Sequence, residues 1–212
     1  MTMEPAKLIA ETFQKGCNDE VNSYGFKFSQ WEAKAREVLS SNSFGYVNGS
    51  AGDRFSDDRD CLDFKKWLFV PRRLCPVDKC EIVPKYKVLG QNIPSPVAVA
   101  PVGVNTIFHR EGERAMARAA NEAGVTLVMS SATSTSVEEV AKANGDGHRF
   151  FQLYWPPNER NDVTASILRR AKDAGFTALL VTLDTYTLGY RPADLQHGYN
   201  PFILPDQTGC GL

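Results

Sequence analysis

The sequence lacks the features that mark membrane, secreted and nucleic-acid-binding proteins. No apolar run approaches the roughly 20 residues that a membrane-spanning helix needs. The N-terminal text MTMEPAKLIAETFQKG carries acidic side chains and no apolar core of a secretory signal. The formal net charge is only −1, which argues against a polyanionic partner. We therefore expect an intracellular protein, cytoplasmic or peroxisomal, that uses neither membrane nor nucleic acid as a partner.

Cysteine and histidine patterns typical of metal sites are also missing. There are only three histidines and five cysteines, namely Cys17, Cys61, Cys75, Cys80 and Cys210. The number of cysteines is odd, their spacing is irregular, and no CxxC pair or interleaved histidine occurs. We expect reduced thiols and no metal site.

From residue 96 onward, apolar strand-like runs alternate with helical patterns. The strand-like runs are 97–100, 125–129, 149–153 and 178–183, and the helical patterns are 111–123, 136–143 and 162–174. This alternation predicts right-handed βαβ units and a parallel sheet. The turn after the first strand, residues 101–105, is not the GxGxxG loop of a dinucleotide-binding sheet. An α/β fold of the (β/α)8 barrel type therefore fits better than a doubly wound sheet.

The predicted strands end in polar side chains. Gln152 and Tyr154 close one strand, and Thr182 and Asp184 close the next. In a parallel α/β sheet, ligands bind at the carboxyl ends of the strands. A single polar strand end is ordinary, because a chain leaves the core there. Several such ends with amide, phenol, hydroxyl and carboxylate groups favour a site.

The length is short for a whole barrel. A (β/α)8 barrel takes roughly 250 residues, whereas only four βα strands are found in these 212 residues. We expect an N-terminal extension (1–28), a helical cap with a lead-in segment (29–95), and the first half of a barrel (96–212) that ends inside a long loop. Four strands leave two unpaired edges, which soluble proteins avoid. This pattern indicates a fragment, a truncated gene product or one partner of a split enzyme.

Seven segments carry a family resemblance, and they occur in the family's order and spacing. They are Phe44-Gly45-Tyr46, Ala100-Pro101-Val102-Gly103, His109-Arg110-Glu111-Gly112-Glu113, Ser130-Ser131, Ser136-Val137-Glu138-Glu139-Val140, Arg149-Phe150-Phe151-Gln152-Leu153-Tyr154, and Thr182-Leu183-Asp184-Thr185 with Leu188-Gly189-Tyr190-Arg191. Through them, residues 30 to 204 resemble the FMN-dependent L-2-hydroxy-acid oxidases and dehydrogenases. The wording FFQLYWPP and LDTYTLGYRPADL is most similar to the lactate 2-monooxygenase members of that family.

The resemblance implies FMN as cofactor and a small, lactate-like L-2-hydroxy acid as substrate. It implies hydride transfer to flavin N5 and reoxidation by oxygen. Arg191 matches an arginine that pairs with the substrate carboxylate, for which a planar fork is suited. Tyr46 and Tyr154 match tyrosines that hydrogen-bond the substrate, and Tyr154 is also assigned to catalysis. Asp184 matches the catalytic carboxylate that orients a histidine base.

The resemblance also implies six flavin-binding residues. Ser130, Gln152 and Thr182 match side chains that contact the flavin ring. Pro101, Val102 and Gly103 match the backbone segment beside N5. Many family members have alanine at the position of Gly103, and we interpret the missing methyl as extra room beside N5, available to oxygen.

The resemblance leaves gaps. The family's histidine base lies in a later segment, and none of His109, His148 and His197 has that context. The phosphate loops of the last two strands are absent as well. The implied partners are therefore the second half of the barrel and, by resemblance, other copies in a homotetramer. We expect this polypeptide alone neither to hold FMN tightly nor to turn over. An alternative is a non-catalytic half-barrel that acts as an interaction or decoy subunit.

Overall fold

The structure, a computed structural model, describes residues 5–21, 25–76 and 86–203 of the chain. Within these ranges, none of the helices is both long enough and apolar enough to cross a membrane. Cys17, Cys61 and Cys75 are exposed and free. Cys80 and Cys210 lie outside the described residues.

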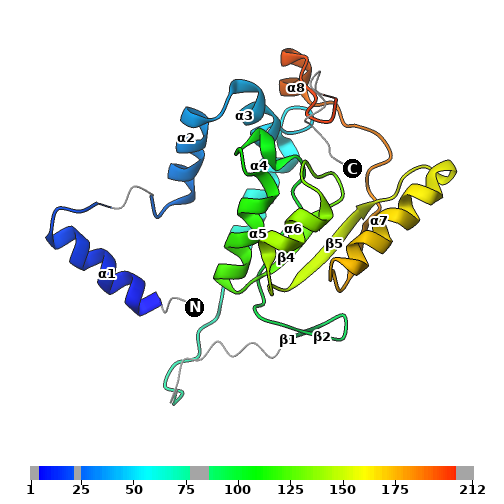
Figure 1. Ribbon diagram of the computed structural model, residues 1–212. Coiled ribbons are helices and arrows are strands. Elements are labelled where there is room, and N and C mark those ends of the chain that lie inside the picture. The colour runs from blue at the N-terminus through cyan, green and yellow to red at the C-terminus, as the bar shows by residue number, and fades with distance from the viewer. Residues whose placement is uncertain (1–4, 22–24, 77–85, 204–212) are drawn as a thin grey trace.

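Helices and strands follow each other in the order shown in Figure 1. The α-helices are α1 (Pro5–Cys17), α2 (Phe28–Val38), α3 (Ser41–Asn48), α4 (Phe55–Asp63), α5 (Gly112–Ala123), α6 (Val137–Asn144), α7 (Asn161–Asp173) and α8 (Pro192–His197). The strands are β1 (Tyr86–Val88), β2 (Gln91–Ile93), β3 (Ala98–Val99), β4 (Thr126–Ser130), β5 (Arg149–Tyr154) and β6 (Leu179–Thr182). Short 3-10 helices are η1 (Phe64–Lys66), η2 (Asn105–Ile107) and η3 (Asn158–Arg160).

Four parallel strands form the main sheet. Their spatial order, β3-β4-β5-β6, is the order in the chain, and each neighbouring pair is parallel. The predicted parallel sheet and its four strands are thus confirmed. Among the described residues the sheet stays open, with β3 and β6 at its two edges, so they form no closed barrel.

The three helices between these strands also lie where the sequence predicts them. Helix α5 ends at Gly124, which adopts the left-handed conformation at φ 64°. Helix α6 is capped by Ser136, whose Oγ accepts a hydrogen bond from the Glu139 N–H at 3.3 Å. Gly175 follows α7 at φ 78°. Local end signals and apolar spacing therefore suffice to define these helices.

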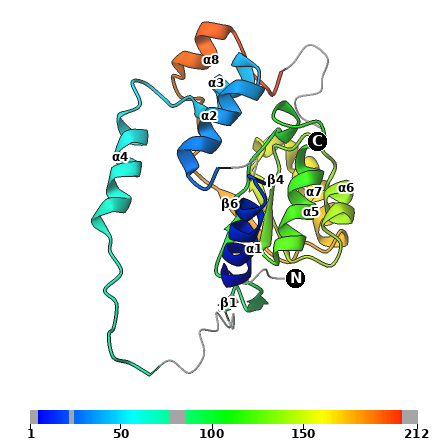
Figure 2. The ribbon, with the colours of Figure 1, turned by 90° about the vertical axis from the view of Figure 1, so that its left-hand side faces the viewer.

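Alternate residues of the strands face opposite sides of the sheet. One side packs against α5, α6 and α7, which lie together on one side of the strands (Figure 2). The buried side chains of this core include Leu127, Met129, Phe151, Leu153, Val140 and Ile167. The other side carries Val128 and Phe150 midway along the strands, and Ser130 and Gln152 nearer their carboxyl ends.

The antiparallel hairpin β1–β2 covers the lower part of this second face. Ile93 packs against Val128 and Phe150, and Gln91 Nε2 donates to the carbonyl oxygen of Thr177 at 2.7 Å. The hairpin therefore covers the part of this face that lies near the amino-terminal ends of the strands. The face toward the carboxyl ends is left to the polar residues.

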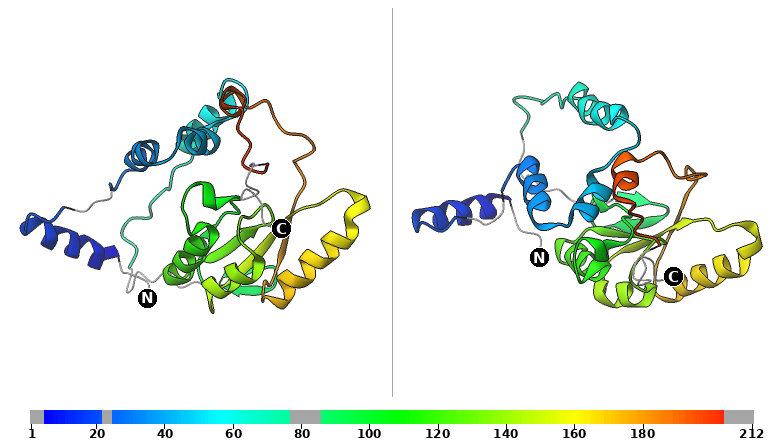
Figure 3. Two further views of the ribbon diagram at one scale, coloured as in Figure 1. Left: turned by 45° about the horizontal axis from the view of Figure 1, so that its top comes forward. Right: turned by 90° about the horizontal axis from the view of Figure 1, so that it is seen from above.

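Two short helices precede the lead-in to the sheet. Helix α2 begins after its N-cap residue Lys27. Helix α3 is capped by Ser40, whose Oγ accepts a hydrogen bond from the Ser43 N–H at 3.1 Å. Helix α3 packs beside α8, and Figure 3 shows the two side by side in both views.

Candidate active site

Three polar side chains form a row across the carboxyl ends of β4, β5 and β6. Ser130 Oγ donates to Gln152 Oε1 at 3.0 Å, and Gln152 Nε2 donates to Thr182 Oγ1 at 2.7 Å. Ser130 and Gln152 are buried, and Thr182 is half-buried. One amide hydrogen of Gln152 and the hydroxyl hydrogen of Thr182 are not used in these bonds. The row, which sequence reasoning proposed as three flavin-contacting residues, can therefore still donate to a polar ligand edge.

The loop after β3 is attached to this row through the loop after β4. The Val104 N–H donates to the carbonyl oxygen of Ala132 at 2.9 Å, and the Ala132 N–H donates to Ser130 Oγ at 3.1 Å. Asn105 Nδ2 donates to the carbonyl oxygen of Val102 at 2.8 Å. Pro101 and Val102 are exposed. The predicted backbone segment and the predicted side-chain row thus belong to one connected edge.

Gly103 has a different role from the one expected. A Cβ added at Gly103 would lie 2.5 Å from the carbonyl oxygen of Ala132, closer than real Cβ atoms approach another heavy atom. The space is already filled by backbone, so the interpretation that the missing methyl leaves room for oxygen is wrong. Glycine is needed here because it lets the loops after β3 and β4 approach each other closely.

Val104 adopts a backbone conformation that is rare for its residue type. Its φ is 45° and its ψ is 41°, in the left-handed region, and its side chain is fully buried. A β-branched residue avoids this region because its side chain crowds the backbone. The conformation is held by the hydrogen bond from its own N–H to Ala132 and by the anchoring of the next residue, Asn105.

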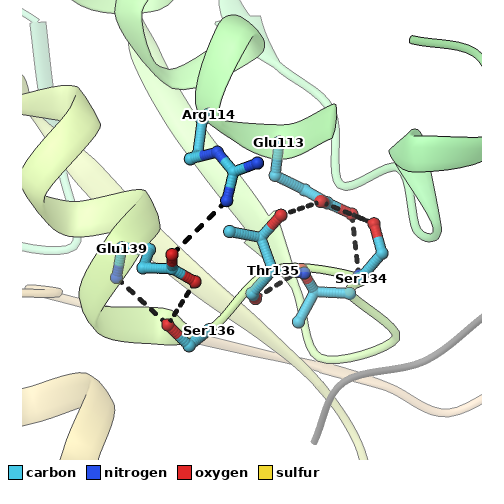
Figure 4. A network of polar contacts seen from close by, with 7 residues as sticks. Glu113, Arg114, Ser134, Thr135, Ser136 and Glu139 are labelled. Carbon is cyan, nitrogen blue, oxygen red and sulfur yellow. Dashed lines mark hydrogen bonds and ion pairs between the residues drawn. The ribbon is translucent and has the colours of Figure 1, made fainter. Parts of the chain in front are cut away.

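That anchor is the carboxylate of Glu113, in the first turn of α5 (Figure 4). Its Oε1 accepts from the N–H groups of Asn105 and Ser134, both at 3.0 Å. Its Oε2 accepts from Thr135 Oγ1 at 2.7 Å and from Ser134 Oγ at 2.8 Å. Burial alone would raise the pKa of Glu113, but the hydrogen bonds from Thr135, Ser134 and Asn105 together lower it. The buried group is therefore ionised at neutral pH.

The sequence alone assigns no role to Glu113. Its only signals are an acidic side chain in the first turn of an alanine-rich helix and, 17 to 23 positions later, a segment rich in hydroxyl donors, residues 130–136. Such an acid is equally typical of a solvated helix start. Only the tertiary contacts distinguish the two cases.

Tyr46 on α3 and Arg191 at the start of α8 lie together. The Arg191 guanidinium carbon is 5.0 Å from the centre of the Tyr46 ring, and Arg191 Nη2 donates to the Tyr46 carbonyl oxygen. Arg191 Nε donates to Asp194 Oδ2 in an ion pair. They line a cavity of about 280 Å³ with Leu188, Tyr199 and Phe202, among others. Two of the three predicted substrate-binding residues thus share one cavity.

Burial raises the pKa of the Tyr46 phenol, an effect that the nearby Arg191 charge opposes. The charge of Asp194 raises this pKa further. Tyr46 is therefore a neutral hydrogen-bond donor over the physiological range.

Tyr154 ends β5 opposite Thr182 of β6, and 43% of its surface is exposed. Its N–H donates to Ser131 Oγ at 2.9 Å. Asp184 is exposed, two residues beyond β6, and its Oδ1 accepts from Thr185 Oγ1 at 2.9 Å. The structure thus brings Tyr154 to the rim and gives Asp184 a local partner.

The three histidines have local contacts. His109 Nδ1 accepts from the Glu111 N–H at 3.2 Å. His148 lies between Thr126 and Gln91, below the rim. His197 ends α8, facing Gly45. In the described part of the chain, no group of three or more His, Cys, Asp or Glu side chains is placed to hold a metal ion.

Comparison with known proteins identifies the family. Residues 35–208 match the family model described as FMN-dependent dehydrogenase. The chain belongs to the FMN-dependent dehydrogenase family. This confirms both the family and the FMN cofactor that the motifs indicated.

Relatives of this FMN-dependent dehydrogenase chain agree with the assignment. An FMN-dependent alpha-hydroxy acid dehydrogenase of Schizosaccharomyces pombe is 41% identical over 97% of this chain and 50% of its own. Another, from Penicillium citrinum, is 46% identical over 81% of this chain and 42% of its own. A crystal structure of a putative lactate oxidase from Pediococcus acidilactici superposes with a TM-score of 0.78 at 27% identity, covering 87% of this chain and 50% of that one. The chain spans about half the length of the curated relatives it matches.

The residues at the rim fit an FMN ring. The isoalloxazine has an edge of carbonyl and N–H groups, and Gln152 keeps an amide hydrogen for such an edge beside the Thr182 hydroxyl. The exposed backbone of 101 and 102 lies within the same connected edge. A flat polar heterocycle could therefore be held from two sides.

Proposed function

We propose that this chain supplies the flavin-facing edge and the carboxylate-binding arginine of an enzyme that oxidises a small L-2-hydroxy acid. One observation carries the proposal. Gln152, at the centre of the hydrogen-bonded row Ser130–Gln152–Thr182, and Tyr154 stand two positions apart on β5, so both face the same side of the sheet, and Tyr154 pairs with Thr182 of β6. A group that binds the cofactor and a group that binds the substrate are thereby neighbours.

In this proposal, Arg191 binds the substrate carboxylate. Its Nε is used by Asp194 and its Nη2 by the Tyr46 carbonyl, which fixes the plane of the guanidinium. Nη1 is not used in these contacts and can donate to a carboxylate oxygen. Tyr46 and Tyr154 supply phenol groups that hydrogen-bond the remaining substrate oxygens.

The side chains of the rim orient the cofactor. Ser130, Gln152 and Thr182 hold the polar edge of the ring, and the backbone of Pro101, Val102 and Gly103 lies against it. When bound, FMN supplies the acceptor for the hydride from the substrate α-carbon. Asp184 orients the histidine base that takes the hydroxyl proton, and that base comes from βα units beyond these four.

We further propose a lactate-sized substrate and reoxidation by oxygen. The cavity volume of about 280 Å³ is at the small end for a ligand site, which favours a small acid. The proposal includes βα units that complete the barrel and a homotetrameric assembly, which the family resemblance implies.

The test compares the wild-type protein with the Arg191→Lys variant, both purified with bound flavin as the cell makes them. Lysine keeps the charge and loses the planar fork. We expect the concentration of L-lactate that half-saturates anaerobic flavin reduction to rise about tenfold or more, with FMN content unchanged. Arg170→Lys, at a half-exposed arginine on α7, serves as the control. Equal half-saturation in all three proteins would contradict the role of Arg191, and wild-type protein without flavin would favour the decoy alternative.

A further inference from the structure

We propose that Glu113 is a positioning residue that locks the loop after β3 in its strained conformation and so presents residues 101–105 to the flavin. The inference rests on the proposed function for the identity of the ligand, while the lock itself is a property of this chain. It concerns a carboxylate that the proposed reaction does not use.

The contacts of Glu113 join three segments of the chain. Glu113 lies on α5, and its Oε1 accepts a hydrogen bond from the Asn105 N–H in the loop after β3. The loop after β4 supplies the other donors, which are the N–H and hydroxyl of Ser134 and the hydroxyl of Thr135. The residue is only 5% exposed. A buried carboxylate that accepts from four donors is strongly fixed, because each bond to a charged acceptor exceeds a neutral one in strength.

The position of the lock explains the conformation of Val104. Asn105 is bound by Glu113, and the Val104 N–H is bound by the carbonyl of Ala132. The left-handed valine lies between these two fixed points. Strained backbone of this kind persists only where its surroundings determine it, and it is concentrated at functional sites.

The same bonds lead from Glu113 to the rim. Ser134 Oγ accepts the Thr106 N–H at 3.2 Å, and Ala132, which holds Val104, is itself held by Ser130. Ser130 then donates to Gln152 in the row. Loss of the Glu113 carboxylate therefore frees the loop after β3. It also loosens the loop after β4, which is bonded to Ser130 of the flavin-facing row.

Glutamine and alanine at this position have different consequences. With Glu113→Gln, the amide oxygen can accept both backbone N–H groups, and the amide hydrogens can be donated to the hydroxyls of Ser134 and Thr135, which accept as well as donate. With Glu113→Ala, the buried N–H groups of Asn105 and Ser134 lose their acceptor. We expect glutamine to preserve the lock largely and alanine to abolish it.

Amide hydrogen exchange tests the lock without any flavin. In Glu113→Ala, we expect the amides of Val104 and Asn105 to exchange about tenfold faster or more than in wild type, and in Glu113→Gln less than about threefold faster. Asn144→Ala is the control, since Asn144 is fully buried and bonded to the Ala117 carbonyl in the helical layer. Exchange at these two amides that is unchanged in Glu113→Ala, or equally fast in Asn144→Ala, would overturn the proposal.

Flavin affinity tests the consequence at the site. In the FMN-loaded protein, Glu113→Ala should raise the FMN dissociation constant about tenfold, whereas Glu113→Gln and Asn144→Ala should change it less than about threefold. An unchanged constant in Glu113→Ala would overturn the link between lock and flavin. Failure of the wild type to bind FMN would instead refute the proposed function, and the exchange experiment would still decide whether the lock exists.

Discussion

Gly103→Ala should destabilise the protein, because the added methyl group meets backbone. The new Cβ would lie 2.5 Å from the Ala132 carbonyl oxygen, whereas ordinary contacts begin near 3.4 Å, so the two loops must separate by about 0.9 Å. Overpacking of this kind costs about 1–3 kcal/mol. The hydrogen bond from the Val104 N–H to the same oxygen is lost or weakened, which adds about 1 kcal/mol. The expected loss of stability is therefore about 2–4 kcal/mol.

Thermal unfolding followed by circular dichroism measures this loss. For a chain of this size, about 2–4 kcal/mol corresponds to a fall in Tm of about 4–16 °C. Gly16→Ala is the matched control, because a Cβ at Gly16 in helix α1 meets nothing within 4 Å. That substitution should leave Tm unchanged or raise it slightly, since alanine favours a helix. A Gly103→Ala protein with the Tm of wild type would refute the close approach of the two loops.

Three other parts of the structure give predictions for stability. Val104→Gly should be more stable than Val104→Ala by about 1–2 kcal/mol in urea unfolding, because both remove the side chain and only glycine tolerates the left-handed backbone; the reverse order would contradict the strained conformation. Gln152→Met should cost about 1–3 kcal/mol, because the hydroxyls of Ser130 and Thr182 lose their partner, and an unchanged urea midpoint would argue against the row. Two hydrogen bonds from Arg170 lower the pKa of the Glu138 carboxyl group to about 2, from an ordinary 4.5. The ion pair therefore contributes fully to the stability of the fold above pH 4.5, and this contribution is lost as the pH falls through about 2. Because the two side chains are about half exposed, screening limits that contribution to about 0.5–1 kcal/mol. Glu138→Gln should be less stable than wild type by this amount at pH 7, and the difference should disappear below pH 2.

The sheet and its three helices could be predicted because their signals are local. Apolar runs mark the strands, and residues such as Ser136 and Gly124 mark helix ends. The row at the rim could also be predicted, since Gln152 and Thr182 come at the ends of neighbouring parallel strands. Periodicity and strand order are enough for both conclusions.

The remaining features depend on contacts between distant residues. Arg191 reaches Tyr46 across 145 positions because α8 packs on α3. The partners of Glu113 lie 8 to 22 positions away, on two different loops. The close approach at Gly103 depends on where the backbone of Ala132 passes. No local pattern contains this information, so the sequence alone shows neither the close approach at Gly103 nor the contacts of Glu113.

The visible spectrum of the purified, desalted protein, as the cell makes it, tests the central claim most directly. The claim is that this chain provides one side of an FMN site at which a small 2-hydroxy acid is oxidised. The account predicts flavin absorption bands that bleach on anaerobic addition of L-lactate or a 2-hydroxy acid of similar size. Flavin bands that no such acid bleaches, or a protein without flavin, would contradict it.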